Sequence, residues 1–177
     1  YLEADGHIIT GWKTLDGGWR YFDASGEQAT GWRAVDGSWY FMADNGLMQT
    51  GWLETGGKKY YLNASGAMQA GWQNLGGSWY YFDGSGAMTT GWQAVGGKWY
   101  YMNESGVMRT GWLDLGGKKY YLDASGAMYA GITFEMEGNT WQAAADGSCT
   151  VVLPEENAAG NGGSTHRQTP TIGSQSP

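Results

Sequence analysis

The sequence predicts an all-β fold in which short β-hairpins repeat along the chain and stack into a solenoid. Three observations lead to this prediction. Glycine recurs every twenty residues without a slip, from Gly11 to Gly131. Two short apolar runs in each unit flank a pair such as Asp16-Gly17 or Gly76-Gly77, which tolerates the positive φ of a tight hairpin turn. The first six of the periodic glycines are each followed by a tryptophan: Trp12, Trp32, Trp52, Trp72, Trp92 and Trp112.

Each unit reads GWxxxxGxWYY, followed by a polar turn and then SGAM, as in residues 71–90 and 91–110. The Trp-Tyr-Tyr run has the propensity of a second strand, and the Ser-Gly pair after it marks a turn that leads to the next unit. A single two-stranded hairpin is marginally stable in water. Stacked hairpins bury a continuous core, so the repetition itself predicts the solenoid.

The pattern divides the chain into four parts. Residues 1–10 align with the second half of a unit, so we expect the chain to open in mid-hairpin, as a piece of a longer array would. Six full repeats follow over residues 11–130, and a divergent sequence over 131–155 is typical of a capping repeat. Residues 156–177 are polar and of low complexity, which predicts a tail or linker.

Composition and charge exclude several classes of function. The formal net charge is -7, which disfavours nucleic acid or an anionic membrane surface as the partner because both require a basic patch. No apolar stretch approaches the ~18 residues of a membrane span, so no membrane insertion is expected. The lone Cys149 allows neither an intrachain disulfide nor a cysteine-rich metal site.

Catalysis is not expected in this chain. His7 and His166 lie in the half repeat and in the tail, away from any catalytic constellation. Carboxylates such as Asp83 and Asp123 follow the second strand, where Asp and Asn stabilise turns. An active site is normally single, whereas these residues recur, so we expect no enzyme, no catalytic residue, no cofactor and no metal.

The motif GWxxxxGxWYYxxxxGxM at a period of twenty resembles the cell-wall-binding repeats of Gram-positive surface proteins. Members of that superfamily include choline-binding modules of autolysins and adhesins, glucan-binding repeats of glucosyltransferases and repeats of large secreted toxins. The resemblance covers roughly residues 1–130. It implies a secreted protein at the cell wall or cell surface, folded as a left-handed superhelix with about three repeats per turn.

In the choline-binding branch, the ligand lies between consecutive hairpins in a cage of three aromatic side chains closed by an aliphatic or Met side chain. The chemistry of choline explains such a cage. A quaternary ammonium group cannot donate a hydrogen bond, so it is recognised by aromatic ring faces, which attract the cation. Several weak cages on a repetitive polymer then bind tightly through effective concentration.

The resemblance predicts the residues of each cage in this chain. It takes the Trp after the periodic Gly and the Trp of Trp-Tyr-Tyr from one unit, and an aromatic residue from the next unit. We assign that aromatic to the second residue after the Trp, and treat the first Tyr, as in Tyr80 and Tyr100, as core. The predicted sets are Trp12 and Trp19 with Phe41, Trp32 and Trp39 with Tyr61, Trp72 and Trp79 with Tyr101, and Trp92 and Trp99 with Tyr121.

Methionines are the candidates for the fourth wall: Met48, Met88 and Met108. Gln28 stands where Met is expected in the first unit, which predicts a weaker site there. Units three and six carry Lys59 and Lys119 in place of the cage Trp, and a lysine would repel a cation. No choline site is therefore expected to begin at those two units, which a solenoid of three units per turn places on one edge.

Three functions are compatible with these residues. The leading one is non-catalytic attachment to a cell surface, by binding choline on teichoic-acid-like polymers. The second is lectin-like binding of glucan or another cell-wall polysaccharide, with sugar rings stacked on Trp and Tyr. The third is a structural or adhesive array with a protein partner, whose aromatic residues are all core. The exposed aromatic columns are also compatible with a homodimer that forms through the last units.

Overall fold

The computed structural model describes residues 5–153. The predicted tail over 156–177 lies outside the described residues, as do residues 1–4 of the half repeat and the end of the predicted cap. The described part contains fifteen strands and no helix. The predicted all-β hairpin solenoid is confirmed.

The strands follow the repeat unit by unit. The strand bounds are β1 Gly11–Leu15, β2 Gly18–Phe22, β3 Gly31–Val35, β4 Ser38–Met42, β5 Gly51–Thr55, β6 Lys58–Leu62, β7 Gly71–Leu75, β8 Ser78–Phe82, β9 Gly91–Val95, β10 Lys98–Met102, β11 Gly111–Leu115, β12 Lys118–Leu122, β13 Ile132–Met136, β14 Asn139–Ala143 and β15 Cys149–Val151. In the six full units the Gly-Trp pair opens the first strand. The second strand holds Trp-Arg-Tyr in unit one, Trp-Tyr-Phe in unit two, and a Trp-Tyr-Tyr or Lys-Tyr-Tyr run in the other four.

The turns have the geometry that the glycine pairs predict. Gly76 and Gly77 have φ values of 62° and 86°, and Asp16 and Gly17 have values of 51° and 78°. Two consecutive positive φ angles define a type I′ turn, whose twist matches that of the paired strands. The tight turn sets the register, so that Trp72 lies opposite Tyr81 across β7 and β8.

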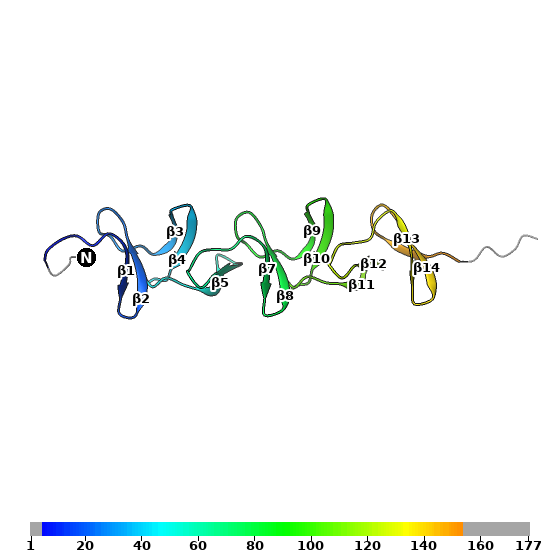
Figure 1. Cartoon of the computed structure of the whole chain (residues 1–177), viewed down its shortest axis with the longest axis horizontal. Helices are drawn as coiled ribbons and strands as arrows, with labels where there is room; N and C mark the ends of the chain where they lie inside the picture. Colours follow the sequence, from blue (N-terminus) through cyan, green and yellow to red (C-terminus); the bar gives the residue numbers. More distant parts are fainter. Residues whose placement is uncertain (1–4, 154–177) are drawn as a thin grey trace, which may run out of the picture.

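The hairpins project from the long axis in three directions (Figure 1). Hairpins β1–β2 and β7–β8 point to one side, and β3–β4 and β9–β10 point to the opposite side. The hairpins of units three and six, at β5 and at β11–β12, lie between these two directions. Units that are three apart in the sequence thus share an edge, so each turn of the solenoid takes three units.

The core is a column of side chains, each of which is the last residue of the second strand in one of the six full units. The members of this column, all 0% exposed, are Phe22, Met42, Leu62, Phe82, Met102 and Leu122. Each forms a β-bridge with the residue six positions later, as Phe82 does with Met88. Full burial of such a side chain is worth about 1.5–3 kcal/mol, so this column is a major source of the solenoid's stability.

Consecutive units are joined by a repeated backbone hydrogen bond. The Met88 N–H donates to the Lys59 carbonyl at 2.7 Å, and the Met108 N–H donates to the Trp79 carbonyl at 2.8 Å. The same bond links Met48 to Trp19, Met68 to Trp39 and Met128 to Trp99. This bond is indifferent to whether the acceptor residue is Trp or Lys, so the stacking of the units does not depend on the cage side chains.

The C-terminal hairpin joins the last full unit in a five-stranded sheet of order β11-β12-β15-β14-β13. Its Trp141 ring lies 4.5 Å from the Trp112 ring, between centroids. Cys149 pairs with Lys119 across β12 and β15 and is buried. Cys149 thus occupies the place that the methionines take at the earlier junctions.

Candidate functional site

Each hairpin presents two different faces to its neighbours. Because Trp72 and Tyr81 are cross-strand partners and residues alternate along a strand, Trp72, Trp79 and Tyr81 share one face while Tyr80 lies on the other. The first face meets the following unit, where Trp72 contacts Tyr100 with ring centroids 4.8 Å apart. The second face meets the preceding unit, where Tyr80 contacts Trp52 at 5.0 Å.

Four junctions enclose a pocket of the same form. Each pocket takes two Trp side chains from one unit, the first Tyr and the Met from the next unit, and two turn residues from the unit after that. The four sets, which we call cages A to D, are Trp12, Trp19, Tyr40, Met48, Ala64 and Ser65; Trp32, Trp39, Tyr60, Met68, Gly84 and Ser85; Trp72, Trp79, Tyr100, Met108, Ala124 and Ser125; and Trp92, Trp99, Tyr120, Met128, Ala145 and Asp146.

The cages are small and nearly identical, with volumes of about 330, 380, 340 and 330 Å³ in that order. In cage C the Trp72 and Trp79 rings meet edge to face with centroids 6.4 Å apart. The first Trp of cages A, B and D contacts the Tyr of the next unit at centroid distances of 4.8, 4.9 and 5.0 Å, as Trp72 contacts Tyr100 in cage C. The second Trp of each cage is open to solvent, with exposures of 50, 48, 44 and 47% for Trp19, Trp39, Trp79 and Trp99.

The structure places the third ring one residue earlier than the sequence predicted. Phe41, Tyr61, Tyr101 and Tyr121 do not line the cages and instead contact the first Trp of their own unit, at centroid distances of 5.1–5.5 Å in the four cases. The first Tyr, which was predicted to be core, takes the place in the cage. The physical reason is the alternation along the strand: the face of a hairpin that meets the preceding unit is the one opposite its own Trp pair.

The prediction for the fourth wall was incomplete. Met48 and Met108 line cages A and C, but Met88 lines a different pocket, at the junction of units three and four. Met68 and Met128, which were not predicted, close cages B and D. A one-unit offset explains the pattern, because each cage takes its Met from the unit after its Trp pair.

The same offset corrects the expectation for Gln28. Cage A is closed by Met48 and not by Gln28, so the first Trp pair has a complete fourth wall. The Gln28 amide donates to the Asn45 carbonyl at 3.1 Å instead. Gln28 therefore gives no reason to expect weaker binding at cage A.

The turn residues at the rim of each cage are held by side-chain hydrogen bonds. In cage B, the Ser85 hydroxyl and Ser85 N–H both donate to the Asp83 carboxylate, at 2.6 and 2.8 Å. The bond from the Ser85 hydroxyl is the main cause that lowers the pKa of Asp83 below its ordinary value. Asn63 accepts the equivalent bonds from Ser65 at cage A, at 2.7 and 3.0 Å.

Cage D differs from the others by a carboxylate. Asp146 takes the rim position that serine takes in cages A to C, and it accepts hydrogen bonds from Ser148 and from Lys118. Hydrogen bonds from Ser148 are the largest cause that lowers the pKa of Asp146 far below its ordinary value. Lys118, 3.0 Å away, balances the charge of this carboxylate.

The junction of units three and four also holds a pocket, but of different composition. It is lined by Trp52, Leu53, Glu54, Lys59, Tyr80, Met88 and Ser105. Lys59 stands where the second Trp lies in cages A to D. This junction shows that the lysine removes one aromatic wall while the pocket stays open.

Residues 5–153 hold no group of three or more His, Cys, Asp or Glu side chains placed to bind a metal ion. No helix in the same part of the chain has the length and hydropathy to cross a bilayer.

A solenoid of stacked hairpins with aromatic cages at four of its junctions defines a class of repeat protein with open pockets between its units. The sequence pattern of the choline-binding repeat matches residues 9–50, 29–70, 49–90, 69–101 and 89–134. These overlapping matches cover most of the chain, which belongs to the choline-binding repeat family. A comparison with curated protein sequences finds no relative.

Solved structures of Streptococcus pneumoniae proteins are similar to the chain. CbpJ from strain TIGR4 is 40% identical with a TM-score of 0.81, and the match covers 85% of this chain and 55% of CbpJ. Choline-binding protein F, solved in the presence of a peptidoglycan analogue, is 39% identical with a TM-score of 0.75, covering 80% and 52%. The modular autolysin LytC is 30% identical with a TM-score of 0.66, covering 85% and 35%. The chain thus spans about half of the first two proteins and about a third of LytC.

Proposed function

We propose that this chain is a non-catalytic attachment module that binds choline groups of teichoic-acid-like polymers in cages A to D. The observation that carries the proposal is the fourfold recurrence of one constellation, three aromatic rings and a methionine around an open pocket. No lysine or arginine lines any of the four cages, so nothing in them repels a cation.

The cages suit a quaternary ammonium group for two physical reasons. The methyl groups of such a cation spread its charge over an apolar surface, which fits rings and sulfur better than hydrogen-bonding groups. Each ring contributes about 0.5–2 kcal/mol to holding the cation. A net charge of -7 adds a general attraction for cationic groups on a polymer.

Repetition converts weak sites into firm attachment. The hairpins that carry the Trp pairs of cages A and C, β1–β2 and β7–β8, point to one side of the solenoid, and those of cages B and D, β3–β4 and β9–β10, point to the other (Figure 1). A polymer with repeated choline groups can therefore engage several cages at once. The second contact of such a polymer is intramolecular, which raises the avidity without a new kind of contact. Similarity to choline-binding protein F and to the autolysin LytC supports a role at the bacterial cell wall. We place the protein outside the cell, on the surface, with this chain anchoring whatever sequence is joined to it.

A choline titration followed by tryptophan fluorescence and by thermal melting tests the proposal. We expect a saturable change in fluorescence and a melting temperature that rises with choline, because a ligand that binds only the folded state stabilises it. The matched control ligand is 3,3-dimethyl-1-butanol, which has the shape of choline without its charge and should bind far more weakly.

Two results would point elsewhere. Absence of any response at tens of millimolar choline would exclude the cages as choline sites. Competition by neutral oligosaccharides together with indifference to choline would favour the glycan function for cages A to D.

A further inference from the structure

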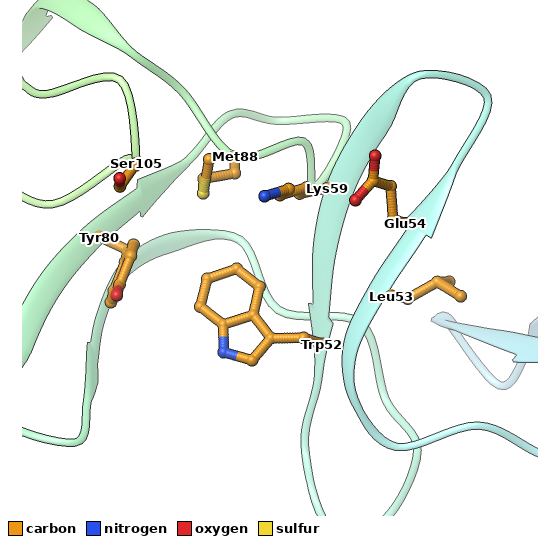
Figure 2. A pocket seen from close by; sticks show the side chains of 7 residues that line it. All are labelled: Trp52, Leu53, Glu54, Lys59, Tyr80, Met88 and Ser105. Atoms are coloured by element: carbon orange, nitrogen blue, oxygen red, sulfur yellow. The ribbon is translucent and has the colours of Figure 1, made fainter.

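The pocket at the junction of units three and four, which we call the Lys59 pocket, has a composition that cages A to D do not share. It has a volume of about 410 Å³, against 330–380 Å³ for the cages. Figure 2 shows Trp52, Tyr80 and Met88 around one opening, with the Lys59 amine directed between Trp52 and Met88. Ser105 lies at the rim, and Glu54 lies beside Lys59.

The missing second Trp opens the face of the first. Trp52 is 47% exposed, whereas its counterparts Trp12, Trp32, Trp72 and Trp92 are half-buried. The junction itself is intact, because Tyr80 lies 5.0 Å from Trp52 between ring centroids and the Met88 N–H reaches the Lys59 carbonyl. A broad indole face is therefore held in place at the floor of an open pocket.

The walls of the Lys59 pocket carry both signs of charge. Glu54 and Lys59 lie opposite each other across β5 and β6. In unit six the equivalent Lys119 amine sits 2.9 Å from Asp114, but within residues 5–153 Lys59 forms no ion pair of that kind. The two groups at the Lys59 pocket thus remain available to a ligand.

This arrangement selects against charged ligands. A quaternary ammonium ion would meet the Lys59 ammonium and would lose one ring of the cage, and an anion would meet the Glu54 carboxylate. A neutral ligand rich in hydroxyl groups avoids both repulsions. It also gains charge-assisted hydrogen bonds, because Lys59 donates to a hydroxyl oxygen and Glu54 accepts from a hydroxyl hydrogen.

We propose that the Lys59 pocket binds a neutral pyranose unit of a glycan chain. The C–H bonds on the apolar side of the sugar ring carry partial positive charge and stack on the negative face of Trp52. Lys59, Glu54 and Ser105 take the hydroxyl groups at the edge of the ring. The chain then recognises two chemistries on separate edges of one solenoid, a quaternary ammonium group at cages A to D and a sugar ring at the Lys59 pocket. Sugar binding at the Lys59 pocket follows from that pocket alone, and only the choline readouts of its test rest on the proposed function.

Two-dimensional ¹H–¹⁵N spectra of the full chain test this proposal through the indole N–H of Trp52, assigned with Trp52→Phe. The probes are a β-1,4-linked tetramer of N-acetylglucosamine and an α-1,6-linked tetramer of glucose. We expect at least one of them to shift the Trp52 signal in a saturable way, and we expect the shift to persist in saturating choline. Glu54→Gln keeps the size of the side chain and should weaken the sugar about tenfold by removing a charged acceptor.

Lys59→Trp is the decisive variant. It turns the sequence of β6 into Lys-Trp-Tyr-Tyr, which β10 already has in cage D. We expect this variant to lose the sugar response at Trp52 and to bind one more choline per chain. Lys58→Ala is the matched control, because Lys58 lies opposite Thr55 on the other face of the hairpin and should change neither response.

Several results would overturn the proposal. One is the absence of a Trp52 shift with both sugars at tens of millimolar. Another is a sugar shift that Glu54→Gln and Lys59→Trp leave unchanged. A Trp52 shift with phosphocholine or acetate but not with sugar would assign the pocket to a charged ligand instead.

Discussion

Two columns of large apolar side chains run along the solenoid in register with the twenty-residue repeat, and one is buried while the other is left open to solvent. The core column, represented by Phe82, is fully buried in every repeat. The cage column, represented by Trp79, lies three positions earlier in units one, two, four and five and is about half exposed, whereas Lys59 and Lys119 take this position in units three and six. Apolar character in a repeat therefore does not by itself distinguish a residue that builds the fold from one that is left open for a ligand.

Position within the hairpin determines whether the side chain is buried or exposed. Phe82 is the last residue of β8, at the base of the hairpin, where the chain folds back and Phe82 bridges to Met88. Trp79 is the second residue of β8, next to the turn that projects away from the axis of the solenoid (Figure 1). The base of the hairpin is therefore fully enclosed, whereas the second Trp beside its turn is left about half exposed.

The largest effect is expected from the core column. Phe82→Ala should lower the free energy of unfolding by about 3–5 kcal/mol, because it removes a buried ring and leaves a cavity. Urea denaturation measures this loss. Trp79→Ala is the matched variant from the cage column and should cost only about 1 kcal/mol. Equal destabilisation by both variants would contradict the distinction between the columns and favour an array whose aromatic residues are all core.

Gly126→Ala tests a turn position at which the backbone requires glycine and which also contacts a side chain of cage C. Gly126 has a φ of 83°, and an added Cβ would lie 2.4 Å from the Sδ atom of Met108, the fourth wall of cage C. We expect a loss of stability of about 1–3 kcal/mol from the backbone strain alone, and weaker choline binding at cage C because Met108 must move. Both are read from one choline titration with thermal melting.

Gly111→Ala is the control for this variant. Gly111 has a φ of 76°, but nothing lies within 4 Å of the added Cβ. It should therefore show the strain without the change in choline binding. If Gly126→Ala binds choline as well as Gly111→Ala does, Met108 is not a wall of the site.

A pair of tyrosine variants tests which ring completes a cage. Tyr100→Leu should weaken choline binding at cage C by roughly two- to thirtyfold, the equivalent of one ring at about 0.5–2 kcal/mol. Tyr101→Leu removes the neighbouring ring, which lies on the opposite face of β10 against Trp92, and should leave the affinity of cage C unchanged. Isothermal titration of both variants decides the matter, and the reverse ranking would restore the second aromatic residue as the cage wall.

The smallest expected effect concerns acid. The pKa of Asp83 is lowered in the folded chain, so the carboxylate stabilises the fold above the ordinary value of about 3.9 and loses this contribution as the pH falls below it. Asp83→Asn should keep the hydrogen bonds from Ser85, as Asn63 does in unit three, and should remove this share of the pH dependence. Melting temperatures from pH values near neutrality down to the unfolding limit measure it. An unchanged acid profile would show that Asp83 contributes nothing to acid stability.

Sequence reasoning could predict the hairpins because their causes are local. The Gly76-Gly77 pair specifies the turn, and the turn sets the register that pairs Trp72 with Tyr81. It could also predict the Trp pair of every cage and the lysines at units three and six, because these follow directly from the repeat. The first Tyr as cage wall was within reach as well, since alternation already separates Tyr80 from Trp79 and Tyr81.

The repeat, the strands, the turns and the two Trp side chains that each cage takes from one unit can therefore be read from the amino-acid sequence. The packing of the units determines which face of the following unit closes the cage, which Met lies against it and that a third unit supplies the rim. It also determines that the junction at Lys59 is an open pocket reaching from Trp52 to Ser105. The physical reason is that these contacts join residues about twenty to fifty positions apart, and their geometry depends on the rotation between stacked hairpins, which no local interaction sets.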